Sequence, residues 1–201
     1  MNLSLLSLKN VTFSKKEKLD LLKAWLLLSL AFALFFSRSL DGNLLLSFII
    51  VLFTAGLGFL LHELAHKITA INYGHEAVFV ADYKMLFGAI IMALFLPIIF
   101  AAPGAVYIRG LVTKKQNGII SVAGPWTNIF LAIFLFFPLS LFGTGILQLI
   151  GIFGFSINSW LALFNMIPVM PLDGAKVWAW NKIIYIITIL IAIFFTFTAF
   201  F

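Results

Sequence analysis

The sequence contains no cysteine and few charged residues. Of its 201 residues only 10% are charged, while 63% are hydrophobic. The lack of cysteine excludes disulfide bonds and thiolate metal ligands. The shortage of charge excludes an ordinary soluble domain, in which about a quarter of the residues are charged. The composition therefore predicts an integral membrane protein.

A compact basic face is also missing, although the formal net charge is +6. The lysines and arginines are scattered over the ends of apolar runs, so we expect no nucleic-acid partner. They act as topology signals, because basic residues accumulate on the cytoplasmic side of a membrane. Several lysines precede the first apolar run, which predicts a cytoplasmic N-terminus in the cell membrane. A signal peptide cleaved near residues 37–39 is the alternative.

Most of the sequence consists of long apolar runs with few charged residues. The hydrocarbon core of a bilayer, about 30 Å thick, needs roughly 20 apolar residues per helix. We therefore predict an all-α, polytopic bundle of about five to six transmembrane helices, formed as a single domain over residues 1–201. The five predicted spans are Ala24–Phe36 with its flanks, Leu44–Leu61, Ile119–Phe142, Ile146–Ile167 and Ile183–Phe201.

A sixth apolar run, Leu86–Ala102, contains Pro97 and is followed by Pro103. As a single span it would reverse every later helix and place the next basic residues outside, against the positive-inside rule. We therefore interpret it as a re-entrant element that enters and leaves on one side, with a full span as the alternative. Alternating residues at 77–81 predict a short strand before it.

Two histidines and a glutamate form the motif H-E-x-x-H where the second apolar run ends. Residues four apart lie on one face of a helix, so His62 and His66 can reach one metal ion while Glu63 addresses water beside it. Zinc fits these donors best, and we expect one Zn²⁺ ion. The alternative without a metal is that the three side chains only cap the helix end. The chain has only three histidines and three glutamates, so chance rarely assembles this spacing.

Catalytic zinc sites generally have three protein ligands, so a third ligand must come from elsewhere in the chain. Asp173 is the acidic residue that ends an apolar span on the same predicted side as the histidines. Its alternative role is to form a turn or cap the helix that follows Gly174. The need for a third ligand favours metal binding by Asp173.

The motifs HELAH, AGPWTN and FNMIPVMPLDG occur in this order. With them the chain resembles the site-2 protease family of intramembrane zinc metalloproteases. The resemblance implies that His62, His66 and Asp173 hold zinc and that Glu63 is the catalytic acid and base. It also implies that the substrate is a transmembrane helix of another membrane protein.

The resemblance covers a core of about residues 44–178, and the run 183–201 adds a C-terminal transmembrane helix. The family pattern G-P-x-x-N matches Asn128, and N-x-x-P-x-x-P-L-D-G matches Asn165. The resemblance implies that both asparagines position substrate or stabilise the oxyanion of the reaction. Alternatively, both amides hold neighbouring helices together.

These expectations predict a zinc-dependent endopeptidase that cuts peptide bonds within or near transmembrane helices. A metal or ion transporter is one alternative, and a zinc-binding relative without activity is another. Transport would favour acidic residues and histidines distributed along a pore, whereas in this chain they are expected at a single depth in the membrane. The sequence does not indicate an oligomeric state.

Overall fold

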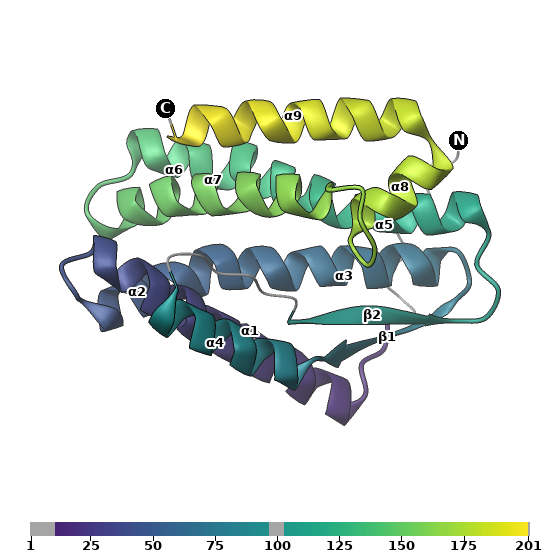
Figure 1. Cartoon of the computed structure of the whole chain (residues 1–201), viewed down its shortest axis with the longest axis horizontal. Helices are drawn as coiled ribbons and strands as arrows, with labels where there is room; N and C mark the ends of the chain where they lie inside the picture. The colour runs from purple at the N-terminus through teal and green to yellow at the C-terminus, as the bar shows by residue number, and fades with distance from the viewer. Residues whose placement is uncertain (1–10, 97–102, 201) are drawn as a thin grey trace.

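The computed structural model describes residues 11–96 and 103–200. Within these ranges five helical segments are long and apolar enough to cross a membrane, and they form one bundle with a small sheet at its flank (Figure 1). The all-α polytopic membrane fold predicted from the sequence is confirmed. The five segments are Lys15–Phe36, Leu44–Asn72, Lys114–Phe142, Ile146–Asn165 and Lys182–Ala199.

The first helix, α1 (Lys15–Phe36), is longer than the apolar run Ala24–Phe36 that predicted it. The hydroxyl of Ser14 accepts a hydrogen bond from the backbone N–H of Glu17 and caps the helix N-terminus. The lysine-rich stretch before the apolar run is therefore helical as well.

The second segment is one continuous helix of 29 residues. It consists of α2 (Leu44–Val51), a π-helical turn η4 (Leu52–Gly56) and α3 (Leu57–Asn72). The HELAH motif therefore lies inside a helix, not at its end as the run Leu44–Leu61 suggested. The helix continues because its polar side chains between positions 62 and 67 are buried against other elements.

The two strands show where the re-entrant element begins and ends. Strand β1 (Glu76–Ala81) pairs antiparallel with β2 (Gly104–Arg109), and Ala81 lies opposite Gly104. The chain leaves the sheet at the end of β1 and returns to the same end of the sheet at the start of β2, which agrees with the re-entrant interpretation and not with a full span. The strand predicted at 77–81 is confirmed.

Helix α4 (Tyr83–Phe95) lies within this excursion, beside α1 (Figure 1). With 13 residues it is too short to cross a bilayer alone. At its start the hydroxyl of Tyr83 donates to Asp20 Oδ1 over 2.6 Å. At its end the guanidinium of Arg38 donates to backbone carbonyls of the last turn. The rest of the predicted element, residues 97–102, lies outside the described residues.

The second half of the chain adds the remaining long helices. Helix α5 lies next to α3, and α7 lies next to α5, so the three segments that carry the motifs meet inside the bundle (Figure 1). Of the predicted last span, Phe201 lies outside the described residues. The bounds are α5 (Lys114–Phe130), η5 (Leu131–Phe136), α6 (Phe137–Phe142), α7 (Ile146–Asn165), α8 (Asp173–Trp180) and α9 (Lys182–Phe200).

Basic residues gather at one end of the bundle. The starts of α1, α5 and α9 and the end of α3 all lie at this end (Figure 1). Arg38 follows α1 at the opposite end, where it bonds to α4. The basic residues in the first turns of these helices are Lys15, Lys16, Lys18, Lys114, Lys115 and Lys182.

Candidate metal centre

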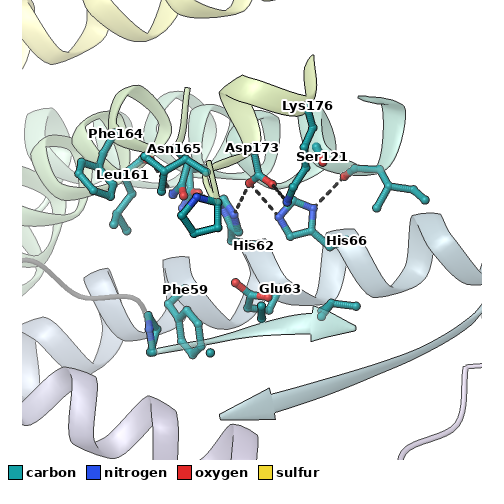
Figure 2. Close-up of a pocket in the computed structure, with 18 of the residues that line it drawn as sticks. Phe59, His62, Glu63, His66, Ser121, Leu161, Phe164, Asn165, Asp173 and Lys176 are labelled. Atoms are coloured by element: carbon teal, nitrogen blue, oxygen red, sulfur yellow. Dashed lines mark hydrogen bonds and ion pairs between the residues drawn. The ribbon is translucent and has the colours of Figure 1, made fainter. Parts of the chain in front are cut away.

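Three metal-binding side chains meet between α3 and the start of α8. His62 and His66 project from one face of α3, and Asp173 is the first residue of α8 (Figure 2). The Nε2 atoms of His62 and His66 lie 3.3 and 3.1 Å from Asp173 Oδ2. All three residues are buried, and one donor atom of each lies within 4.8 Å of the others. The structure thus brings the three predicted ligands together.

The second ring nitrogen of each histidine determines its tautomer. His62 Nδ1 lies 2.6 Å from Asn128 Oδ1, and His66 Nδ1 lies 2.8 Å from the carbonyl oxygen of Ile120. Both partners are acceptors, so each Nδ1 carries a proton and each neutral ring turns the lone pair of Nε2 toward Asp173. Three electron-rich atoms converge, an arrangement that a cation stabilises.

The spacing of these atoms fits a metal ion. Ligands bound at about 2.0–2.1 Å to a tetrahedral divalent ion such as zinc lie about 3.3 Å from one another. The observed separations from Asp173 Oδ2 are 3.3 and 3.1 Å. Two imidazoles and one carboxylate leave a fourth position for water or substrate.

Asp173 begins α8, but its side chain does not cap the helix. While Oδ2 faces the histidines, Oδ1 accepts a hydrogen bond of 3.3 Å from Lys176 Nζ. Burial raises the pKa of Asp173, but the positive charge and the N–H groups that His66 and His62 offer it when they are protonated, with no metal bound, lower it by more, so that it lies well below its usual value. The carboxylate is therefore ionised, as a metal ligand must be.

A glycine lets α5 approach the imidazoles. A Cβ atom at Gly124 would lie 2.5 Å from His62 Nε2 and 2.6 Å from His66 Cε1. Any other residue at this position would displace the two rings. The glycine of the AGPWTN motif is therefore required by the packing of α5 against the metal-binding face of α3.

Glu63 lies beside the three ligands, on the side of α3 that faces β2 (Figure 2). It is buried, and its Oε2 has no hydrogen-bond partner among residues 11–96 and 103–200. Glu63, the two histidines and Asp173 line one cavity of about 530 Å³. A carboxylate oxygen without a partner in such a cavity is free to exchange a proton with a bound molecule.

The two predicted asparagines lie in different places. Asn128 contacts His62 directly, whereas Asn165 lies on the cavity wall at the end of α7 and donates to Leu161 O over 2.9 Å. The catalytic roles that the resemblance implies for them stay predictions. Sequence reasoning missed Asn158, which accepts a hydrogen bond of 2.9 Å from Asn128 Nδ2. Its only signal was an amide in the middle of an apolar span.

Two known proteins are similar to this chain. A protein of Methanocaldococcus jannaschii named "Putative zinc metalloprotease MJ0611" is 42% identical over 177 residues, which cover 87% of this chain and 90% of that protein. A protein of Bacillus subtilis named "Putative zinc metalloprotease YwhC" is 32% identical over 139 residues, 59% of this chain and 63% of that protein. No family model and no solved structure matches the chain.

Fold and site define a polytopic helical membrane protein with a candidate metal centre of two histidines and one aspartate. The similarity to the protein of M. jannaschii extends over nearly the whole length of both chains. The chain belongs to the zinc metalloprotease family of these two relatives.

Proposed function

We propose that this protein is an intramembrane zinc metalloprotease that hydrolyses peptide bonds within or near the transmembrane helices of other membrane proteins. The observation that carries this proposal is the convergence of His62, His66 and Asp173 inside a helical bundle, with Glu63 on the same cavity. The names of the two relatives support zinc as the metal and proteolysis as the reaction.

His62, His66 and Asp173 would hold the zinc ion. When bound, zinc polarises a carbonyl group and makes water more acidic. Nδ1 of each histidine is occupied by an acceptor, so both Nε2 atoms are oriented toward the ion before it binds.

Glu63 would act as the acid and base. Its Oε2, unpartnered in the described chain, can accept a proton from water in the cavity and return it to the nitrogen of the leaving group. The role does not require movement of Glu63, because the residue already lines the cavity with the ligands.

Strand β2 offers a place for the substrate backbone. Phe79 of β1 donates its backbone N–H to Glu17, away from β2. Val106 lies opposite Phe79 in the ladder, so its own N–H and C=O point to the other edge of β2. No described strand covers that edge, and β2 lines the cavity from Gly104 to Ile108. An extended segment can therefore pair with β2 beside Glu63.

A transmembrane substrate must unwind before it can bind in this way. The peptide groups of a helix are bonded within the helix and shielded by its side chains. We therefore expect better cleavage of substrates that carry glycine, proline or asparagine near the cut. Equal cleavage of an uninterrupted polyleucine span would contradict this expectation.

The distribution of basic residues supports an orientation for this proposal. Lys114, Lys115 and Lys182 lie at the starts of α5 and α9, at the end of the bundle where α3 ends. By the positive-inside rule this end faces the cytoplasm. We propose that the protein resides in the cell membrane and that water reaches the cavity from the cytoplasmic side.

Purified protein and its Glu63→Gln variant, each incubated with a single-span substrate, test the function. The wild type should cleave and the variant should not, although both should contain one zinc ion per chain. A chelator should stop cleavage, and added zinc should restore it. Cleavage by the variant at the wild-type rate would show that Glu63 is not the base, and wild-type protein that binds zinc without cleaving any span would contradict proteolysis.

A further inference from the structure

A series of amide hydrogen bonds leads away from the metal centre through three helices. His62 of α3 bonds to Asn128 of α5 over 2.6 Å. Asn128 Nδ2 donates to Asn158 Oδ1 of α7 over 2.9 Å. Asn158 Nδ2 then donates to Gly154 O over 2.9 Å. Asn128 and Asn158 are both fully buried, so none of these amides can exchange its protein partner for water.

Backbone carbonyls fix the direction of every bond in this series. The carbonyl oxygens of Gly154 and Thr54 only accept, so the NH₂ group of Asn158 faces them, at 2.9 and 3.4 Å. Asn158 Oδ1 is therefore turned toward Asn128. It receives the NH₂ group of Asn128, which leaves Oδ1 of Asn128 as the acceptor for His62.

The helices pack closely around the contact between the side-chain amides of Asn128 and Asn158. A Cβ atom at Gly58 would lie 2.2 Å from Asn158 Oδ1 and 3.2 Å from Asn128 Nδ2. Gly58 also accepts a second, longer bond of 3.2 Å from Asn128 Nδ2 through its backbone carbonyl. The glycine leaves room for Asn158, and the shorter bond from Asn128 goes to Asn158.

We propose that Asn158 is a positioning residue of the metal centre. Through Asn128 it holds His62 in the tautomer that carries its proton on Nδ1, with the lone pair of Nε2 directed at the metal position. Asn158 does not contact the metal position itself. The proposal rests on the metal centre of the proposed function but not on proteolysis.

Asn128 needs Asn158 because the oxygen and the nitrogen of an amide group are similar in size and exchange places when the group rotates. With Asn158 in place, Asn128 can present only its oxygen to His62, because its nitrogen is bonded elsewhere. Without Asn158 one N–H of Asn128 has no acceptor, and rotation of the amide would offer that N–H to His62 Nδ1. The proton of His62 would then move to Nε2, where it blocks metal binding.

Zinc affinity of the full-length protein in detergent micelles tests the proposal. Asn158→Leu removes the amide that orients Asn128, and we expect the zinc dissociation constant to rise about 10–100-fold, as when the direct partner of a metal-bound histidine is lost. Ser159→Ala is the matched control, since Ser159 is the next residue, equally buried, and its Oγ has no bond within the described chain. Wild-type affinity in the leucine variant would overturn the proposal.

Asn158→Asp should rescue binding. A carboxyl group protonated in the bundle interior keeps one acceptor for Asn128 and one donor for Gly154, so its affinity should stay within about threefold of wild type. A loss as large as that of the leucine variant would also overturn the proposal. Circular dichroism verifies folding, and Asn158→Ala replaces the leucine variant if leucine proves too large.

Nitrogen NMR of labelled imidazoles gives a readout that does not need zinc. The chain has only three histidines, so His62 can be assigned with single substitutions. In zinc-free protein His62 should be protonated at Nδ1, and the leucine variant should shift it toward the Nε2 tautomer. An unchanged tautomer would contradict the proposal, whereas normal zinc binding without cleavage would contradict only the proposed function.

Discussion

Glu17 and Lys67 form a buried ion pair that joins α1 to α3, the helix that carries both histidines of the candidate metal centre. The distance from Lys67 Nζ to Glu17 Oε1 is 2.5 Å, and each side chain is only 2% exposed. The same carboxylate oxygen accepts the backbone N–H of Phe79 in β1 over 2.9 Å. One residue of α1 thus connects the sheet to the residue that follows His66.

Glu17→Gln should destabilise the protein. The substitution keeps an acceptor for Phe79 but leaves the ammonium of Lys67 buried without a counter-charge. Loss of one partner from a buried ion pair costs about 3–5 kcal/mol. Unfolding by titration of micelles with a denaturing detergent should show this loss. The double variant Glu17→Gln with Lys67→Met should recover most of it, because no unpaired charge remains.

The pair of Arg109 and Glu76 provides the matched control. These two side chains lie 3.4 Å apart but are 78% and 76% exposed. Exposed pairs contribute less than about 1 kcal/mol. Glu76→Gln should therefore change the free energy of unfolding very little, and an effect equal to that of Glu17→Gln would show that burial is not what makes the first pair important.

Gly124→Ala should abolish metal binding without unfolding the bundle. The added methyl group would overlap His62 Nε2 at 2.5 Å and displace the ring from Asp173. Gly88→Ala in α4 is the control, since its Cβ meets no atom within 4 Å. Helix propensity predicts a gain of roughly 0.5–1 kcal/mol there. Zinc content after dialysis distinguishes the two variants, and a full complement of zinc in Gly124→Ala would refute the packing argument.

Removal of the metal should lower the melting temperature of the wild type. A ligand present at 1,000 times its dissociation constant stabilises the folded state by about 4 kcal/mol. A chelator should therefore destabilise the wild type but leave the melting temperature of Asp173→Ala unchanged. The same shift in both proteins would mean that the metal binds elsewhere.

Zinc should also dissociate as the pH falls from about 7 to about 5. The imidazoles of His62 and His66 must be neutral to bind it, so protons compete with the metal ion for Nε2 as the pH falls. Asp173 does not cause this loss, because its pKa lies well below the usual value and its carboxylate stays ionised until a lower pH. Zinc retention measured against pH tests this expectation, and retention that is flat down to about pH 4 would contradict it.

Arg38→Met should loosen the end of α4. Arg38 donates to the carbonyls of Ala93 and Leu94 over 2.9 and 2.8 Å, and these groups belong to the last turn of α4, whose carbonyls have no partner inside the helix. Hydrogen exchange of the last turn of α4 should become about tenfold faster, which corresponds to the roughly 1.4 kcal/mol of a charged hydrogen bond. Lys84→Met, at the other end of α4, should leave that turn unchanged.

The convergence of His62, His66 and Asp173 could be predicted because it needs only local patterns and coordination chemistry. The spacing of His62 and His66 needs only helix geometry, and Asp173 follows from the need for a third ligand. The apolar runs located all five long helices for the same reason. Their ends were less accurate, since Ser14 extends α1 beyond its apolar run and buried polar side chains extend α3.

Contacts between distant positions could not be predicted. Glu17 and Lys67 are 50 residues apart, and both resemble the surface charges that flank membrane spans. Asn158 has no motif around it, and its role depends on a glycine 100 positions earlier, Gly58, that leaves space for its side chain. Such relationships arise only when helices are packed against one another.

The two histidines of the candidate metal centre are oriented by different kinds of hydrogen-bond partner. As a result, mutation can alter the orientation of one histidine more easily than that of the other. His66 bonds to the main chain of Ile120, which every amino acid would supply equally. His62 bonds to a side chain, which a single codon change can replace. Of the two hydrogen bonds that orient the histidines, substitution can therefore change the one from His62 to Asn128 directly, but not the one from His66.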